Sequence, residues 1–156
     1  MITANLTTLM EFLNKNNYSA DIQKETQQVF TILKIAQRDY PLFLRLFPES
    51  QHLQMLLFVP TQLQPDSKYD MARLLHMLNK EMDLPGFGMD EVAGVVFYRL
   101  MIPAMHKKID GELLLGYLKT AQNICELFMG PIEAVAQGHA TLDEILKKAQ
   151  EAEESK

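Results

Sequence analysis

Apolar side chains recur at every second position in three successive runs between residues 29 and 59, and this alternation constrains the fold more than any other feature. The runs cover residues 29–36, 42–47 and 52–59, with turns expected at residues 38–39 and 48–50. A period of two is typical of β-strands, because successive side chains point to opposite faces. Three consecutive strands joined by short turns predict an antiparallel meander.

Two helices are expected on either side of this meander, because apolar residues recur there at helical spacing. The first covers residues 4–15, with Thr3 as its cap. The second begins after Ser67, and Asp70, three residues later, completes a capping-box pattern. Both are amphipathic, so each should bury one face against the sheet.

Two more helices are expected near the end of the chain. The longer begins at Asp110 as its cap, is kinked or interrupted at Gly130 and Pro131, and stops at Gly138. Thr141, followed by a glutamate three residues later, opens the last and shorter helix. These signals place all the remaining helical sequence after the sheet.

The remaining strands complete the expected fold class. Residues 86–91 predict a short strand or tight loop, and residues 92–102 predict a long strand. The resulting order is α-β-β-β-α-β-β-α-α, an α+β fold in which helices lie on an antiparallel sheet made of the meander plus a short and a long strand. We expect one domain over residues 1–156, with residues 139–156 as an appended helix and tail.

One face of each predicted strand is apolar and belongs to the core, but the second face is apolar as well. It also carries one cation on each of three strands. Its members are Phe30, Ile32, Lys34, Phe43, Arg45, Phe47, Leu56, Phe58, Val95, Phe97, Arg99 and Met101. An exposed antiparallel sheet face is normally polar, so either the chain's own helices or a partner chain or second copy should cover this one. Ten methionines favour a partner slightly, since flexible thioethers let a surface adapt.

Charge excludes several classes of partner. The chain has 15 basic and 20 acidic residues, a formal net charge of −5, and so lacks the basic field that attracts phosphate groups. We therefore expect neither nucleic acid nor an acidic membrane surface as a partner. The surplus acid lies after residue 108, which leaves the sheet region neutral. The sequence has no signal-peptide pattern and no apolar stretch long enough to span a bilayer, so the expected location is the cytoplasm.

The residues that carry chemistry are few and scattered. His52, His76, His106 and His139 fall in four different elements, and Cys125 is the single cysteine. A zinc site or a redox pair needs several such ligands at short spacing, so neither is expected. A nucleophilic Cys125 would need a histidine beside it in the fold. We predict a protein without enzymatic activity, cofactor or metal.

The chain resembles the YbjN-type proteins and the class I type III secretion chaperones that share their fold. The resemblance rests on residues 74–79 (LLHMLN), 86–91 (GFGMDE), 94–99 (GVVFYR) and 110–114 (DGELL), within a matching element order over residues 4–130. The chaperone branch implies a small, acidic, cytosolic homodimer that binds an extended segment of another protein. The YbjN-type branch implies the same fold with an undefined role. The helix after Gly138 is additional to this pattern.

The preferred hypothesis is a bacterial, chaperone-like protein-binding module that holds an extended apolar segment of a client protein. Its client-binding residues are Phe30, Ile32, Lys34, Phe43, Arg45, Phe47, Leu56, Phe58 and Arg99. The chaperone resemblance implies a homodimer formed through Met71, Leu74, Leu78 and Phe87. The alternatives are a YbjN-type regulator or stability factor with no secreted client, and a small-molecule-binding protein with a pocket between helix and sheet.

Overall fold

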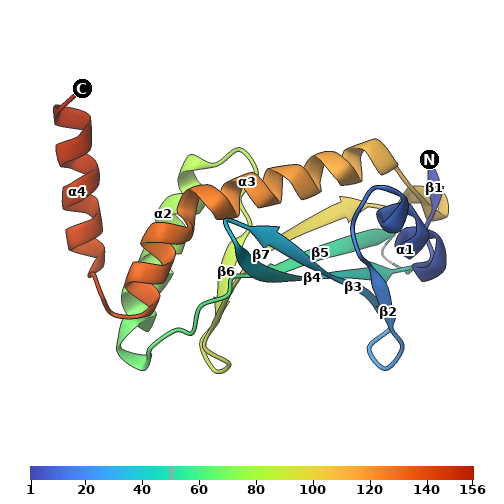
Figure 1. The fold of residues 1–156 in the computed structure, drawn as a ribbon, viewed down its shortest axis with the longest axis horizontal. Coiled ribbons are helices and arrows are strands. Elements are labelled where there is room, and N and C mark those ends of the chain that lie inside the picture. The colour runs from blue at the N-terminus through green and yellow to red at the C-terminus, as the bar shows by residue number, and fades with distance from the viewer. Residues whose placement is uncertain (50) are drawn as a thin grey trace. The chain divides into compact units, whose positions relative to one another are not determined.

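The computed structural model describes residues 1–49 and 51–156 (Figure 1). Ser50, the last residue of the second expected turn, lies outside the described residues. The chain forms two compact units: the first holds Met1–Pro60 and Tyr98–Glu126, and the second holds Thr61–Phe97 and Leu127–Lys156. The expectation of one domain over residues 1–156 stays a prediction.

The meander is the centre of the first unit. It consists of β3 (Gln28–Ile35), β4 (Arg38–Phe47) and β5 (His52–Phe58), paired antiparallel. Its first turn lies at residues 36–37, whereas residues 38–39, where the turn was expected, pair with the end of β3. Ala36 and Gln37 have φ of 49° and 65°, and positive φ at both central residues gives a turn whose twist matches the flanking strands. The meander is confirmed, and the position of its first turn is corrected.

The whole sheet has six strands in the order β2-β3-β4-β5-β7-β6. β2 (Asp21–Gln23) pairs with β3 at the edge of the first unit. β7 (Val95–Pro103) follows β5, and the backbone N–H of Ala104 donates to the carbonyl of Gln51 at 2.8 Å. β6 (Phe87–Asp90) belongs to the second unit and is β7's other neighbour. The α+β class with an antiparallel sheet is confirmed.

A second, two-stranded sheet was not expected from the sequence. β1 (Ile2–Thr3) pairs with β8 (Lys108–Ile109), so that Ile2 lies opposite Ile109. This pairing draws the start of the chain to the segment after β7. Thr3 lies in β1 and does not cap the first helix: the cap is Asn5, whose side chain accepts a hydrogen bond from the Thr8 N–H at 2.8 Å.

Two helices cover the inner face of the first unit's sheet (Figure 1). They are α1 (Leu6–Lys15) and the first part of α3 (Gly111–Ala136). Leu9 and Leu13 of α1, and Leu114 and Leu118 of α3, are fully buried. The inner-face strand residues are at most 2% exposed: Val29, Thr31, Leu33, Leu42, Leu44, Leu53, Met55 and Leu57. One face of the meander is therefore the core, as its alternation predicts.

The second unit contains α2 (Lys68–Glu81), preceded by the short η1 (Pro65–Ser67), and α4 (Leu142–Glu154). The capping box expected at the start of α2 is absent, since the Ser67 side chain makes no capping hydrogen bond. Asp70 instead accepts a hydrogen bond from the Leu142 N–H at 3.0 Å, at the first residue of α4. The cap of α4 is Thr141, as expected, with its hydroxyl accepting from the Glu144 N–H at 3.2 Å. Asp70 thus joins two helices far apart in sequence.

The helix α3 is continuous through the Gly130 and Pro131 positions, so of the kink or interruption expected there, the interruption is absent. A proline removes one backbone donor from a helix, at a cost of about 3 kcal/mol. Ile132 and Val135, on the same helix, are each 1% exposed, and their burial offsets this cost. Gly138 ends the helical segment with φ of 74°, as expected. None of the helices in the described part of the chain is long and apolar enough to cross a membrane.

Candidate interaction surface

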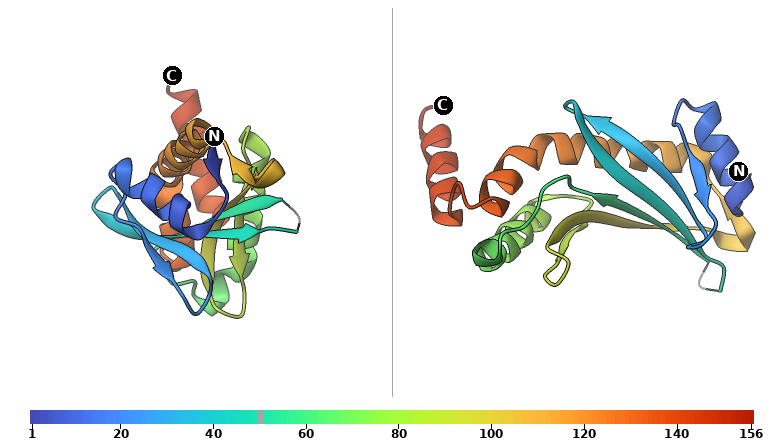
Figure 2. Two further views of the ribbon diagram at one scale, coloured as in Figure 1. Left: turned by 90° about the vertical axis from the view of Figure 1, so that its right-hand side faces the viewer. Right: turned by 60° about the horizontal axis from the view of Figure 1, so that its bottom comes forward.

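The second face of the first unit's sheet is open. We call it the outer face and define it by Phe30, Ile32, Phe43, Leu56, Phe58 and Met101. Figure 2 (right) shows β3 and β4 in front of α3, with this face turned toward the reader. The side chains of Ile32 and Met101 are 40% and 47% exposed, and the other four are half-buried. The two helices of the first unit, α1 and the first part of α3, lie on the opposite, inner face of this sheet.

Cross-strand pairing organises the aromatic side chains of this face. Phe30 lies directly opposite Phe43, which lies directly opposite Leu56. The ring centroids of Phe30 and Phe43 are 5.1 Å apart, and those of Phe43 and Phe58 are 5.8 Å apart in an edge-to-face arrangement. Such pairs contribute about 0.5–1.5 kcal/mol beyond their burial. The rings therefore hold one another in place and form a preorganised apolar surface.

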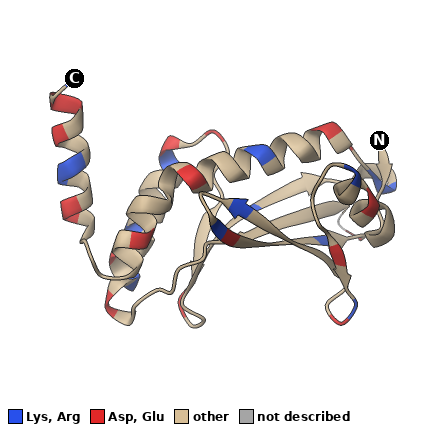
Figure 3. Ribbon diagram, in the orientation of Figure 1, with Lys and Arg blue, Asp and Glu red and all other residues tan. Residues whose placement is uncertain are grey.

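The three cations predicted for this face have different surroundings. Lys34 forms an ion pair with Asp39 at 2.8 Å, and both side chains are well exposed. The guanidinium of Arg45 lies over the ring of Phe47, 4.8 Å from its centroid, and Arg99 is exposed on β7. Figure 3 shows both signs of charge on the strands and on α4. Since Asp39 neutralises Lys34 locally, Arg45 contributes more to the positive charge of this face than Lys34 does.

Two residues assigned to the same face lie in the second unit. Val95 and Phe97 are the first part of β7 and are half-buried. The ring of Phe97 packs on Gly88 of β6 so closely that a Cβ at that glycine would lie 2.8 Å from ring atoms. A larger residue at position 88 would clash with the ring, so this close contact depends on glycine there. Phe97 therefore has a packing role within the second unit.

The residues implied for a dimer are packed inside the second unit. Met71, Leu74 and Phe87 are 0%, 3% and 6% exposed, and Leu78 is half-buried. The ring of Phe87 lies edge-on to that of Phe128, with centroids 6.3 Å apart. A side chain buried within one chain has little area left for a second chain to bury. The dimer contact through these residues stays a prediction.

Asn79 has a structural role that the sequence pattern did not reveal. It lies near the end of α2, and its side-chain oxygen accepts hydrogen bonds from the backbone N–H groups of Gly86 and Phe87 at 3.1 and 2.9 Å. Its side-chain nitrogen donates to the carbonyl of Phe87 at 2.8 Å. One amide thus satisfies three backbone groups at the entry to β6. The only sequence signal was its place between the apolar run of α2 and the glycine-bearing segment.

The described residues offer no evident catalytic or metal centre. Within residues 1–49 and 51–156, no three His, Cys, Asp or Glu side chains come together in a way that could hold a metal ion. Cys125 is 1% exposed, and burial raises the pKa of its thiol from 9.0 to about 12. A nucleophilic cysteine needs a lowered pKa, so Cys125 is a core residue.

Alkaline pH should destabilise the fold through Cys125 and Tyr98. Burial, with a smaller contribution from Cys125, raises the pKa of Tyr98 from 10.0 to about 12. Both pKa values lie above their unfolded values, so the stability is complete below pH 9 and is lost as the pH rises toward 12. We expect the urea midpoint, followed by circular dichroism, to be lower at pH 11 than at pH 8. Cys125→Ala should reduce this drop, and a wild-type midpoint that is unchanged at pH 11 would contradict the assignment.

These features define an α+β protein whose most distinctive surface is an apolar sheet face. Residues 5–134 match the model of a family described as "YbjN: Putative bacterial sensory transduction regulator", and the chain belongs to this YbjN family. It is similar in fold to a solved structure described as "Crystal structure of YbjN, a putative transcription regulator from E. coli", with a TM-score of 0.62 and 12% identity. That match covers 86% of this chain and 93% of the other. No curated protein matches the chain, and its resemblance to secretion chaperones stays a prediction.

Proposed function

We propose that the chain is a cytoplasmic regulatory protein without catalytic activity, which acts by binding a segment of another protein on its outer face. The observation that carries the proposal is the exposure of Ile32 and Met101 beside a preorganised group of aromatic rings. A large exposed apolar patch marks an interaction site. The description of the YbjN family as regulators supports this proposal over a secretion chaperone.

The chemistry of the face specifies its occupant. The exposed guanidinium of Arg45 lies over the ring of Phe47 on this face, although the chain as a whole carries a net charge of −5. Complementary charge selects among partners that offer similar apolar area. The occupant is therefore a segment with two or three large apolar side chains flanked by carboxylates. A segment flanked by basic residues is repelled.

Synthetic peptides test this specificity directly. The probes are three fluorescent peptides with the same leucine and phenylalanine residues, flanked by glutamate, by glutamine or by lysine. We expect the affinity, measured by fluorescence anisotropy, to be highest for the glutamate peptide and lowest for the lysine peptide. The double variant Ile32→Glu with Met101→Glu should bind the glutamate peptide at least about tenfold more weakly, because it loses apolar contact and adds repulsion.

A matched control separates the face from the rest of the surface. Val92 and Leu127 are 99% and 70% exposed and belong to the second unit, so Val92→Glu with Leu127→Glu adds the same charge elsewhere. This control should bind as the wild type does. Equal affinity for the three peptides, or equal loss in both double variants, would refute the proposal. Sedimentation tests the remaining possibility, that a second copy of the chain occupies the outer face. In that case the wild type is a dimer, and only the Ile32 and Met101 double variant dissociates it.

A further inference from the structure

The methionine side chains of this chain differ widely in their access to solvent. The chain has ten of them, and Met55 and Met71 are fully buried in the core. Among the described residues, the exposed methionines are Met101 at 47%, Met105 at 53% and Met1 at 81%. Of these three, Met101 alone belongs to the outer face. An oxidant dissolved in water therefore reaches one thioether of the proposed binding surface.

The single cysteine of the chain does not compete for such an oxidant. Cys125 is 1% exposed, and burial raises the pKa of its thiol to about 12, so the thiol stays protonated at neutral pH. The thiolate, not the thiol, is the form that reacts with a hydroperoxide. In the folded chain, a hydroperoxide therefore meets exposed thioethers and not a reactive thiolate.

The place of Met101 in β7 confines the effect of oxidation to the surface. Its neighbours Leu100 and Ile102 are 8% and 0% exposed, because they point to the inner face and anchor the strand in the core. The Met101 side chain points to the outer face, where the oxygen of a sulfoxide accepts hydrogen bonds from water. Oxidation of Met101 therefore leaves the core contacts, and with them the fold, unchanged.

A bound partner makes the same oxidation unfavourable. When a partner covers the outer face, it removes water from Met101, and the sulfoxide oxygen loses its hydrogen bonds. A buried polar group without a hydrogen-bond partner is unfavourable, whereas the unoxidised thioether contributes adaptable apolar contact. A modification shifts a binding equilibrium only when it affects the free and bound states differently. At Met101 it does so, since only the bound state buries the added oxygen.

We propose that Met101 is a modification site at which a hydroperoxide, by oxidising the thioether to a sulfoxide, weakens binding of the partner segment to the outer face. The proposal rests on the binding function proposed for that face. The sulfur lone pair attacks one oxygen of the hydroperoxide, the O–O bond breaks and an S–O bond forms. Sulfur loses two electrons, and the hydroperoxide is reduced to an alcohol, or to water when it is hydrogen peroxide. A methionine sulfoxide reductase reverses the step with two thiols, which form a disulfide and water.

Hydrogen peroxide and the glutamate-flanked peptide test the proposal on the full chain. Mass spectrometry of proteolytic peptides gives the oxidised fraction of each methionine, and fluorescence anisotropy gives the affinity before and after treatment. We expect Met101 and Met105 to be oxidised before the buried methionines, and the affinity to fall at least about tenfold. The circular dichroism should stay that of a folded chain. Methionine sulfoxide reductases A and B with dithiothreitol should restore the affinity, because each reduces one epimer of the sulfoxide.

Two variants assign the effect to one sulfur atom, and each is compared with its own untreated form. Met105→Leu removes an exposed thioether outside the outer face, so peroxide should still lower its affinity about tenfold. In Met101→Leu, peroxide should change the affinity by less than about twofold. An equal fall in both variants would overturn the proposal.

The same measurements separate the modification site from the function on which it rests. If the untreated wild type binds the glutamate and lysine peptides equally, the binding function is refuted, and the role of Met101 falls with it. If the preference for the glutamate peptide survives complete oxidation of Met101, the modification site alone is refuted. Resistance of Met101 to peroxide while Met105 is oxidised has the same consequence, whatever the peptides do.

Discussion

Asn79→Ala should lower the free energy of unfolding by about 3 kcal/mol, because it removes three partly buried hydrogen bonds at once. Each bond contributes about 1 kcal/mol, and backbone groups left without a partner add to the cost. For a chain of this size, such a loss lowers the melting temperature by roughly 6–12 °C. Hydrogen exchange should show the same effect locally, as faster exchange of the Gly86 and Phe87 amides.

Two further variants test the cause of this loss. Asn79→Asp keeps the oxygen that accepts from Gly86 and Phe87 but loses the donor to the Phe87 carbonyl, so its effect should be intermediate. Asn14 is a control in the first unit, since its side chain also bonds the backbone, at the N–H and the carbonyl of Ala20, but at an exposed site. Asn14→Ala should cost about 1 kcal/mol. An Asn79→Ala protein as stable as the wild type would contradict the role given to Asn79.

The sequence predicts the meander well because burial and alternation act along one short stretch of chain. Leu42 and Leu44 point into the core and Phe43 points out, and each can be assigned without knowing its partner strand. β1 and β2 were missed because strands of two or three residues contain no period. They form because of what they pair with, as Ile2 does with Ile109. Such pairing between distant segments leaves no local pattern.

The helix caps that differ from the sequence prediction, at the starts of α1 and α2, also depend on pairing between distant segments. Asp70 fits a capping box in sequence, but the fold brings the first N–H of α4 within 3.0 Å of its carboxylate. A local motif names a possible partner, and the fold decides which partner is available. Pro131 illustrates the converse, since burial of neighbouring side chains keeps α3 continuous where the local signal predicts a kink or an interruption.

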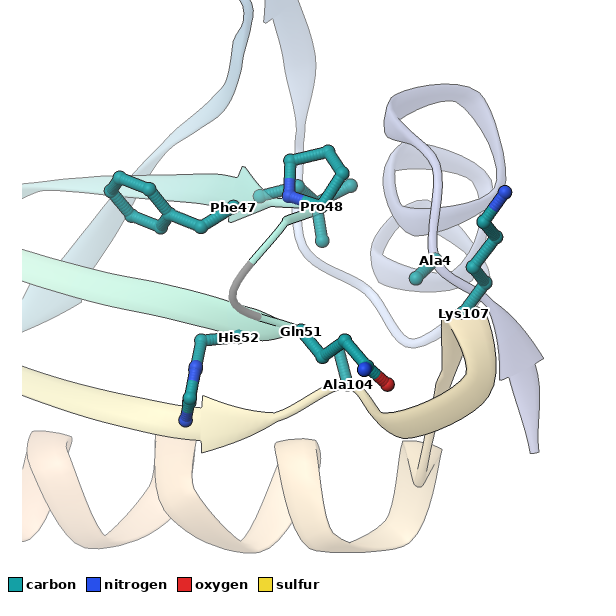
Figure 4. A pocket seen from close by; sticks show the side chains of 8 residues that line it. Ala4, Phe47, Pro48, Gln51, His52, Ala104 and Lys107 are labelled. Atoms are coloured by element: carbon teal, nitrogen blue, oxygen red, sulfur yellow. The ribbon is translucent and has the colours of Figure 1, made fainter.

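The candidate surface was predictable only in part. Register along β3, β4 and β5 placed Phe30, Phe43 and Leu56 on one face correctly, because each strand's alternation is unbroken. An apolar stripe such as Met71 and Leu74, however, looks the same in sequence whether it meets its own chain or a partner. The pocket lined by Ala4, Leu46, Gln51 and Ala104 (Figure 4) could not be foreseen, because four separate segments of the chain build it.

Substitutions at two adjacent residues of β4 should have very different effects on stability, because their side chains point to opposite faces of the sheet. Leu44 is 1% exposed on the inner face, whereas Phe43 is half-buried on the outer face. Leu44→Asp should unfold the first unit, because losing a buried leucine costs about 2–5 kcal/mol and burying an unpaired carboxylate costs several more. That sum reaches the total stability of an ordinary domain, about 5–15 kcal/mol.

Phe43→Asp should leave the protein folded, with a loss of about 2 kcal/mol from the aromatic contacts with Phe30 and Phe58. The melting temperature should fall by roughly 4–8 °C. Adding Phe58→Asp places two carboxylates among the apolar side chains that contact the proposed partner. This double variant should keep the circular dichroism of a folded chain but bind the glutamate-flanked peptide at least a hundredfold more weakly, which is about 2.8 kcal/mol. If it unfolds as Leu44→Asp does, the outer face is core and not a binding surface.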